Sequence, residues 1–116
     1  MRIRLLSLLV ALMVAAAASA GVTTVFSGVS AASGSSGEID TSGAYTLAVQ
    51  VSGTGFSGTV TVYQGAVSGK LTATKTLTLT SYTGHSEYYL LDPSTLTQID
   101  YTRSAGTLTV YLEYYR

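Results

Sequence analysis

The sequence predicts an all-β fold, a single antiparallel β-sandwich of jelly-roll or immunoglobulin-like type with about seven to eight short strands after an N-terminal signal helix. Apolar and polar residues alternate in one short segment after another, and clusters of Gly, Ser and Thr separate these segments at intervals of about 8 to 12 residues. Beyond the first 20 residues there is no helical period, and the abundant Thr, Val and Tyr favour strands.

The first 20 residues have the three parts of a secretory signal peptide. A basic head with two arginines precedes an uncharged apolar run at residues 5–17, and Ala-Ser-Ala at 18–20 supplies the small residues that a signal peptidase requires. The alternative is an uncleaved membrane anchor, although a span needs about 20 apolar residues and this run is shorter. We therefore expect a secreted protein, extracellular or at the cell surface, that begins at Gly21 and meets a membrane only through an uncleaved signal segment.

Removing 20 of the 116 residues leaves 96, which is enough for one domain. We expect a signal peptide at residues 1–20, a β-prone segment with a Ser/Gly linker at 21–37, and the sandwich domain at 38–116. The mature chain retains four cationic side chains against six carboxylates, a formal charge of −2. Because the four cations are scattered, nucleic acid is not an expected partner.

Stability cannot come from disulfides, because the chain contains no cysteine. Small secreted domains without disulfides need another source of stability, namely a sheet core, a bound ion or association with further copies.

The first two predicted strands lie at residues 44–51 and 56–64. In the first, Leu47, Val49 and Val51 share one face, and in the second the apolar residues again alternate with Thr and Tyr. Between them, Ser52–Gly55 has the sequence Ser-Gly-Thr-Gly, which predicts a hairpin turn.

Four further strands are predicted in the second half of the chain. They lie at residues 71–80, 86–92, 96–103 and 107–115. Lys75 falls on the apolar face of the first of these, which indicates a bulge, an edge position or a strand that starts later.

No group of residues predicts catalysis, a metal site or a cofactor. His85 is the only histidine, and its neighbours Ser86 and Glu87 would point to opposite faces of a strand, so the three do not form a triad. The carboxylates are too dispersed for a calcium site, and a zinc site would have one imidazole and no thiolate. We therefore expect a protein that is not an enzyme.

Tyrosines gather in the C-terminal half, where Tyr88, Tyr89, Tyr111 and Tyr115 are candidate exposed contacts. Adjacent tyrosines on a strand point to opposite faces, so some of them must lie outside the core. They would contact a polysaccharide or a cell-surface protein, or they would simply cover the open ends of a small sandwich.

Two stretches carry a family resemblance. "IDTSGAYTLAVQVSGTGFSGTVTVYQG" and "YTRSAGTLTVYLEYY" resemble small β-sandwich domains of virion structural proteins and of cell-surface appendage subunits, over most of residues 38–115. The signal peptide favours the secreted, appendage-like branch. The resemblance implies a fold and a structural role, and it carries no catalytic residue.

The N-terminal segment is the feature that points to association. Five of its residues, in a run rich in β-branched side chains, would form a donated strand: Val22, Thr24, Val25, Phe26 and Val29. The segment could pair with its own domain, join the sheet edge of the next subunit, or stay disordered. We expect a structural protein that forms a homo-oligomer or filament by strand donation. The alternative is a monomeric extracellular module that presents its tyrosines to a polysaccharide or a surface partner.

Overall fold

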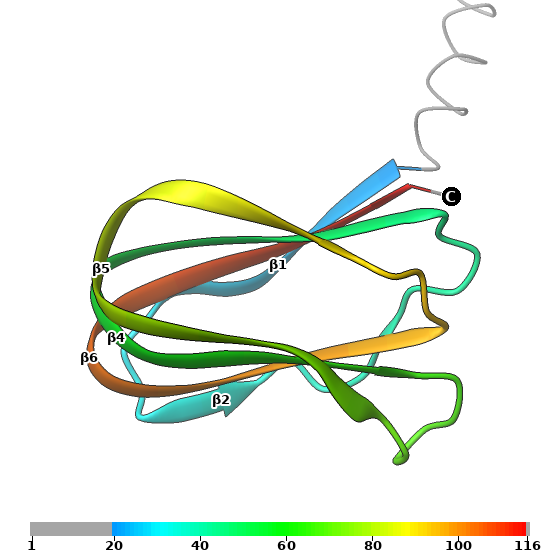
Figure 1. Cartoon of the computed structure of the whole chain (residues 1–116), viewed down its shortest axis with the longest axis horizontal. Coiled ribbons are helices and arrows are strands. Elements are labelled where there is room, and N and C mark those ends of the chain that lie inside the picture. The colour runs from blue at the N-terminus through cyan, green and yellow to red at the C-terminus, as the bar shows by residue number, and fades with distance from the viewer. Residues whose placement is uncertain (1–19, 116) are drawn as a thin grey trace, which may run out of the picture.

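The computed structural model describes residues 20–115, and for Ala20 and residues 85–88 it describes the backbone alone. Within these residues, six strands follow one another: β1 (Ala20–Val29), β2 (Ser33–Ser35), β3 (Ile39–Asp40), β4 (Thr46–Gly65), β5 (Thr72–Leu91) and β6 (Leu96–Tyr115). They form one antiparallel sheet in the order β1-β6-β4-β5, in which β2 and β3 also pair with β6 (Figure 1). The predicted all-β class is confirmed, and the predicted signal helix lies outside the described residues.

Three strands are about twice as long as the sequence predicts. Ser52–Gly55, predicted to be a hairpin turn, lies inside β4, so the predicted strands on either side of it are halves of one strand. Likewise, β5 and β6 each join two predicted strands. The hairpin prediction is wrong because the glycines bend the strand without reversing it. The two separate sheets of a sandwich are not seen among the described residues.

The long strands bend at the same level of the sheet. Register shifts in the pairing of β4 with β6 mark this bend. A Cβ on Gly58 (φ 156°) would collide with the carbonyl oxygen of Thr102, and a Cβ on Gly106 (φ 76°) would collide with that of Gly55. Glycine is therefore required at both positions.

Side chains bond the backbone where the bend interrupts the ladder. The Gly55 N–H donates to Thr83 Oγ1 at 2.7 Å, and the Ser81 N–H donates to Ser57 Oγ at 2.9 Å. The Ser104 hydroxyl donates to the carbonyl of Ser57 at 3.2 Å. Polar groups that leave the ladder at the bend thus regain partners, which limits the cost of bending the sheet.

Bending places the two halves of the sheet face to face as two layers (Figure 1). The ring of Phe26, on β1 in one layer, packs edge-on against Tyr101, on β6 in the other, with centroids 4.7 Å apart. Phe56 lies within the bent segment of β4 and is fully buried. Aliphatic side chains of β4, β5 and β6 make up most of the remaining core: Leu47, Val49, Val51, Val60, Val62, Leu77, Ile99, Leu108, Val110 and Leu112.

The N-terminal segment runs along β6 of its own chain. The pairing starts with Ala20 opposite Tyr115, continues through β2, and ends with Asp40 opposite Leu96. Of the arrangements that the sequence left open, self-pairing is the one seen in the single chain.

Two glycines in this segment are covered by tyrosine rings from β6. Gly21 pairs with Tyr114, and a Cβ on the glycine would lie 2.6 Å from the ring. Gly34 pairs with Tyr101, and a Cβ there would lie 2.5 Å from the ring. The absence of a side chain on each glycine therefore lets a tyrosine of the neighbouring strand fold over the sheet edge.

Buried hydroxyls tie the loop before β4 to the turn between β5 and β6. Thr41 is fully buried, and its hydroxyl lies 2.6 Å from the carbonyl of Ser94 and 3.0 Å from Thr97 Oγ1. The Thr41 N–H donates to the carbonyl of Thr95 at 2.9 Å. This loop carries the chain from β3 to β4, so the hydroxyl bonds fix the point where the N-terminal segment leaves the sheet edge.

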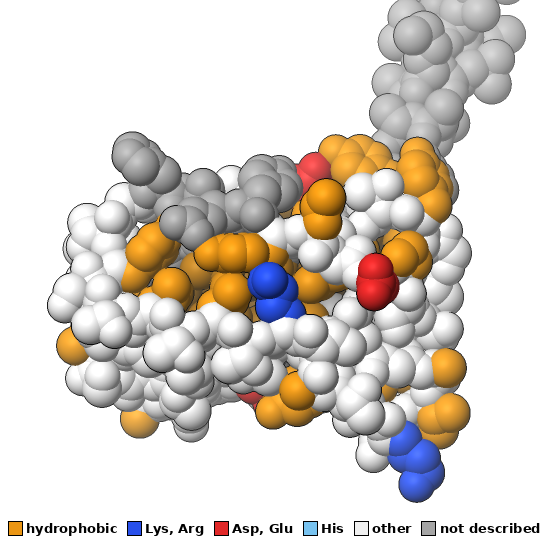
Figure 2. All heavy atoms as spheres, viewed as in Figure 1, with side chains coloured by type: hydrophobic (Ala, Val, Ile, Leu, Met, Phe, Trp, Pro, Cys, Tyr) orange, Lys and Arg blue, Asp and Glu red, His pale blue; other side chains and the backbone are white. Residues whose placement is uncertain are grey.

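Lys75 lies on β5, which forms one end of the strand order. Its pairing with Val62 is followed by a register shift, so the edge position and the bulge are both confirmed. The Lys75 ammonium lies 4.9 Å from the ring centroid of Tyr89, on the other half of the same strand. Figure 2 shows a basic side chain among hydrophobic side chains on this side of the molecule.

The two covered glycines provide a matched pair of substitutions. We expect Gly34→Ala to lower the free energy of unfolding by about 1 to 3 kcal/mol, because the Tyr101 ring is buried against Phe26 and cannot yield. Gly21→Ala should cost less, since Tyr114 is only half-buried. Urea unfolding of both variants measures the difference, and equal losses would contradict this account of the tyrosine covers.

Candidate functional site

The predicted donor residues divide between the two faces of β1. Val22 and Thr24 are exposed and lie opposite Glu113 and Tyr111 of β6. Phe26 is buried with 8% of its surface exposed. The strand therefore completes the core on one face and presents an open face to solvent.

Adjacent residues of β1 both reach the core. Val25 and Val29 are half-buried and pack against the cluster that contains Phe26. Strict alternation would send Val25 and Phe26 to opposite faces. A register shift between Thr24 and Phe26 accompanies the departure from that rule.

A short exposed connection separates β1 from the rest of the N-terminal segment. Residues 30–32 are exposed and lie outside the strands. The connection is anchored at its far end, where the Arg103 N–H donates to the carbonyl of Ala32 at 2.7 Å. β1 is thus joined to the anchored part of the chain through Ser30 and Ala31.

The four candidate tyrosines do not form one group. Tyr89 packs against the core beside Lys75. Tyr111 is half-buried and Tyr115 is 37% exposed, and the Tyr115 hydroxyl donates to Glu113 at 2.5 Å, which raises the pKa of Tyr115. Tyr88 has only its backbone described, opposite Gln50. No common aromatic surface follows from the described side chains.

His85 lies in β5, and its side chain is outside the described part of the structure. Among the described residues, no three His, Cys, Asp or Glu side chains gather in a way that could hold a metal ion. Over the same residues, no helix is long and apolar enough to cross a membrane.

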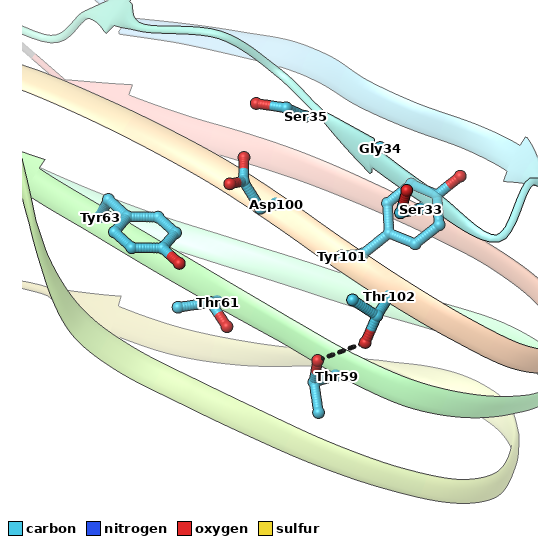
Figure 3. Close-up of a pocket in the computed structure, with 9 residues that line it drawn as sticks. All are labelled: Ser33, Gly34, Ser35, Thr59, Thr61, Tyr63, Asp100, Tyr101 and Thr102. Carbon is cyan, nitrogen blue, oxygen red and sulfur yellow. Dashed lines mark hydrogen bonds between the residues drawn. The ribbon is translucent and has the colours of Figure 1, made fainter. Parts of the chain in front are cut away.

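Sequence reasoning did not single out a polar trough on the outer face of the layer that holds β2. Its larger hollow has a volume of about 440 Å³ and lies over β2, β4 and β6, as Figure 3 shows. The lining residues are Ser33, Gly34 and Ser35 of β2, Thr59, Thr61 and Tyr63 of β4, and Asp100, Tyr101 and Thr102 of β6. The polar members alternate with core residues, so the sheet that builds the core also presents the trough.

A second hollow, about 300 Å³, shares two residues with the first. Tyr63 and Asp100 line both hollows, and Glu38, Gly69, Leu71 and Gln98 complete the second. We call the two hollows together the trough. The alternating Thr, Tyr and Asp in the sequence were the available signal, but only the pairing of β4 with β6 brings them together.

Several polar side chains in the trough have defined partners. Gln98 Nε2 lies 3.1 and 3.3 Å from the two carboxylate oxygens of Asp100. Thr59 and Thr102 share a hydrogen bond of 2.7 Å between their hydroxyls. The first contact lies within β6, and the second joins β4 to β6.

Glu38 closes one end of the trough. Its carboxylate accepts a hydrogen bond from the Gly69 N–H at 2.7 Å and another from the Ser68 hydroxyl at 2.5 Å. These bonds, the one from Gly69 first, lower the pKa of Glu38 below its usual value. The contact links the N-terminal segment to the turn between β4 and β5.

Comparison with known proteins gives a fold and no family. No family model and no curated protein matches the sequence. The structure is similar to the crystal structure of SPBc2 prophage-derived protein YomS, with a TM-score of 0.62 and 15% identity over 84% of this chain and 93% of that one. A second similar structure is the crystal structure of PirA, with a TM-score of 0.41, 16% identity and the same coverage. The likeness to YomS concerns the fold alone, and the PirA match is too distant to add to it.

The Glu38 contact predicts a pH dependence. Because its folded pKa is depressed, the contact contributes fully above the unfolded value of 4.5 and is lost as the pH falls through the folded pKa. We expect hydrogen exchange at the Gly69 amide, corrected for its intrinsic pH dependence, to lose protection over that acidic range. In Glu38→Gln the protection should be weaker and independent of pH there. A wild-type amide whose protection stays constant below pH 4.5 would contradict the contact.

Proposed function

We propose that this chain is a secreted structural protein that associates with copies of itself by exchanging β1, and so builds an extracellular filament or surface layer. The single observation that carries the proposal is the position of β1: an edge strand that supplies the buried ring of Phe26 and is joined to the rest through two exposed residues.

If β1 left its own chain, it would expose a strand edge and an apolar site that a second copy of β1 could fill. The outer edge of β6 from Leu108 to Tyr115 would lose its main-chain partner, and Tyr101 would lose the ring that covers it. Unpaired strand edges and exposed apolar surface both drive association. Burying one Phe side chain is worth about 1.5 to 3 kcal/mol, so the vacancy favours a strand of the same sequence.

The same contacts form whether β1 comes from its own chain or from a neighbour. The exchanged and the self-paired forms therefore contain nearly the same contacts. Protein concentration and the backbone geometry of Ser30 and Ala31 then decide which form is populated. Thr41 and Ala32 are anchored, which confines the exchanged unit to β1 and leaves β2 and β3 in place. A head-to-tail exchange that does not close into a ring continues as a filament.

Two sequence features support an extracellular setting for this association. The signal peptide pattern would release a chain that begins at Gly21, inside β1, so only the pairing of Ala20 with Tyr115 would be lost. The resemblance to appendage and virion subunits is to domains that assemble into larger structures. A second candidate function, that of an extracellular binding module, is favoured by the trough and is developed below.

An engineered cysteine pair distinguishes exchange from self-pairing. Val22 and Glu113 are opposite each other, and cross-strand Cα separations of about 4.5 to 5.5 Å permit a disulfide. Because the natural chain has no cysteine, Val22→Cys with Glu113→Cys creates the only pair. After oxidation of the assembled mature protein, we expect a ladder of disulfide-linked oligomers on a non-reducing gel.

The single variant Val22→Cys is the control, and it should give at most a dimer. A double variant that yields only internally bridged monomers, in a sample that light scattering shows to be assembled, would rule out exchange of β1. A mature protein that stays monomeric in light scattering at high concentration would contradict the structural role itself.

A further inference from the structure

We propose that the trough binds a neutral polysaccharide, with Tyr63 as the stacking platform and Asp100 as the principal hydrogen-bond acceptor. This inference is independent of strand exchange, because the trough lies on the layer opposite β1 and contains none of its residues. It also differs from an aromatic site built on Tyr89, Tyr111 and Tyr115, because none of these three lines either hollow.

The lining of the trough matches a ligand rich in hydroxyl groups. Ser33, Ser35, Thr59, Thr61 and Thr102 contribute hydroxyls from neighbouring strands, and each hydroxyl both donates and accepts hydrogen bonds. A sugar hydroxyl also donates and accepts hydrogen bonds. Each hydroxyl of the trough can therefore pair with a sugar hydroxyl in either role.

Asp100 and Gln98 form a hydrogen-bonded pair in the lining of the trough. The amide of Gln98 holds both carboxylate oxygens of Asp100 at 3.1 and 3.3 Å, which fixes the orientation of the carboxylate. An ionised carboxylate has about four acceptor positions, so the amide leaves capacity for the hydroxyls of a ligand. Hydrogen bonds that involve a charged partner are about twice as strong as neutral ones.

Tyr63 lies where an aromatic ring could stack on a sugar that is hydrogen-bonded to Asp100. It lines both hollows together with Asp100, and Figure 3 shows its ring and the carboxylate on neighbouring strands at the same end of the larger hollow. The ring is half-buried, so the sheet restrains it. A sugar ring stacked on Tyr63 would bury the C–H face of the sugar against the aromatic ring, and the equatorial hydroxyls of the sugar would reach Asp100.

Charge excludes the anionic alternatives. No Lys or Arg side chain lines either hollow of the described structure, whereas Asp100 and Glu38 both do. A phosphate, a sulfated polysaccharide or a nucleic acid would meet repulsion without a compensating cation.

The dimensions favour a chain over a single sugar. The hollows follow one another along β6 from Thr102 to Gln98, a rise of about 13 Å, and the second continues to Gly69 in the turn before β5. This length accommodates several sugar rings, so binding should strengthen with oligosaccharide length up to the length of the trough.

The test uses the full mature protein on a glycan array that carries neutral glucans, galactans, mannans and chitin oligomers beside sulfated glycans. We expect selective binding to at least one neutral series, with affinity rising with chain length. For that ligand, Tyr63→Ala should weaken binding by at least about tenfold, and Asp100→Asn by about fivefold or more.

Tyr45→Ala is the matched control, because Tyr45 is 69% exposed and does not line the trough. It should bind as the parent does, and the thermal unfolding of all three variants verifies that they are folded. Binding to sulfated glycans in preference, undiminished binding by folded Tyr63→Ala, or no binding to any neutral series would each overturn the proposal. None of these outcomes bears on the exchange of β1.

Discussion

The bend shared by the three long strands is the constraint on which the rest of the structure depends. Without it, β4, β5 and β6 would form a flat sheet with an apolar face open to water. Gly58 and Gly106 permit the backbone to turn, and Phe56 fills the interior where it does. One sheet thereby encloses its own core in a chain that has no cysteine for a disulfide.

The bent sheet also determines what is left open. Folding a sheet upon itself closes the apolar faces but keeps two edges, β5 on one side and the N-terminal segment on the other. Lys75 places a charge at the first edge, above the ring of Tyr89. At the second edge β1 contributes Phe26 to the core, so the strand proposed to exchange is also one that the core requires. The outer face of the layer that holds β2 carries Thr59, Thr61 and Asp100, and the trough lies among these side chains.

Local patterns predicted the inward faces of the strands well. Leu47, Val49 and Val51 are buried as alternation requires, and so are Leu108, Val110 and Leu112. The path of the chain was not predictable in the same way. Ser52–Gly55 has a composition that suits a hairpin turn and equally suits a bend within a strand, because glycine permits both and only long-range pairing selects one.

The candidate sites show the same limit. The sequence identified Val25 and Phe26 as members of a strand that would pair with a sheet edge, and in the structure both contact the core. It could not identify Asp100 and Tyr63 as partners, because they are far apart in the chain and meet only through the register of β4 with β6. Its tyrosine candidates failed to form one surface for the related reason that alternation sends Tyr89 inward.

Backbone proton contacts in the deuterated mature protein, measured by nuclear Overhauser spectroscopy, test the bent sheet most directly. The account predicts contacts between Val51 and Val110 on one side of the bend and between Val60 and Tyr101 on the other, because β4 pairs with β6 along both halves. A tight hairpin at Ser52–Gly55 would instead pair the two halves of β4 with each other. Contacts between Val51 and Phe56 across such a turn, with none from Val60 to Tyr101, would contradict the account.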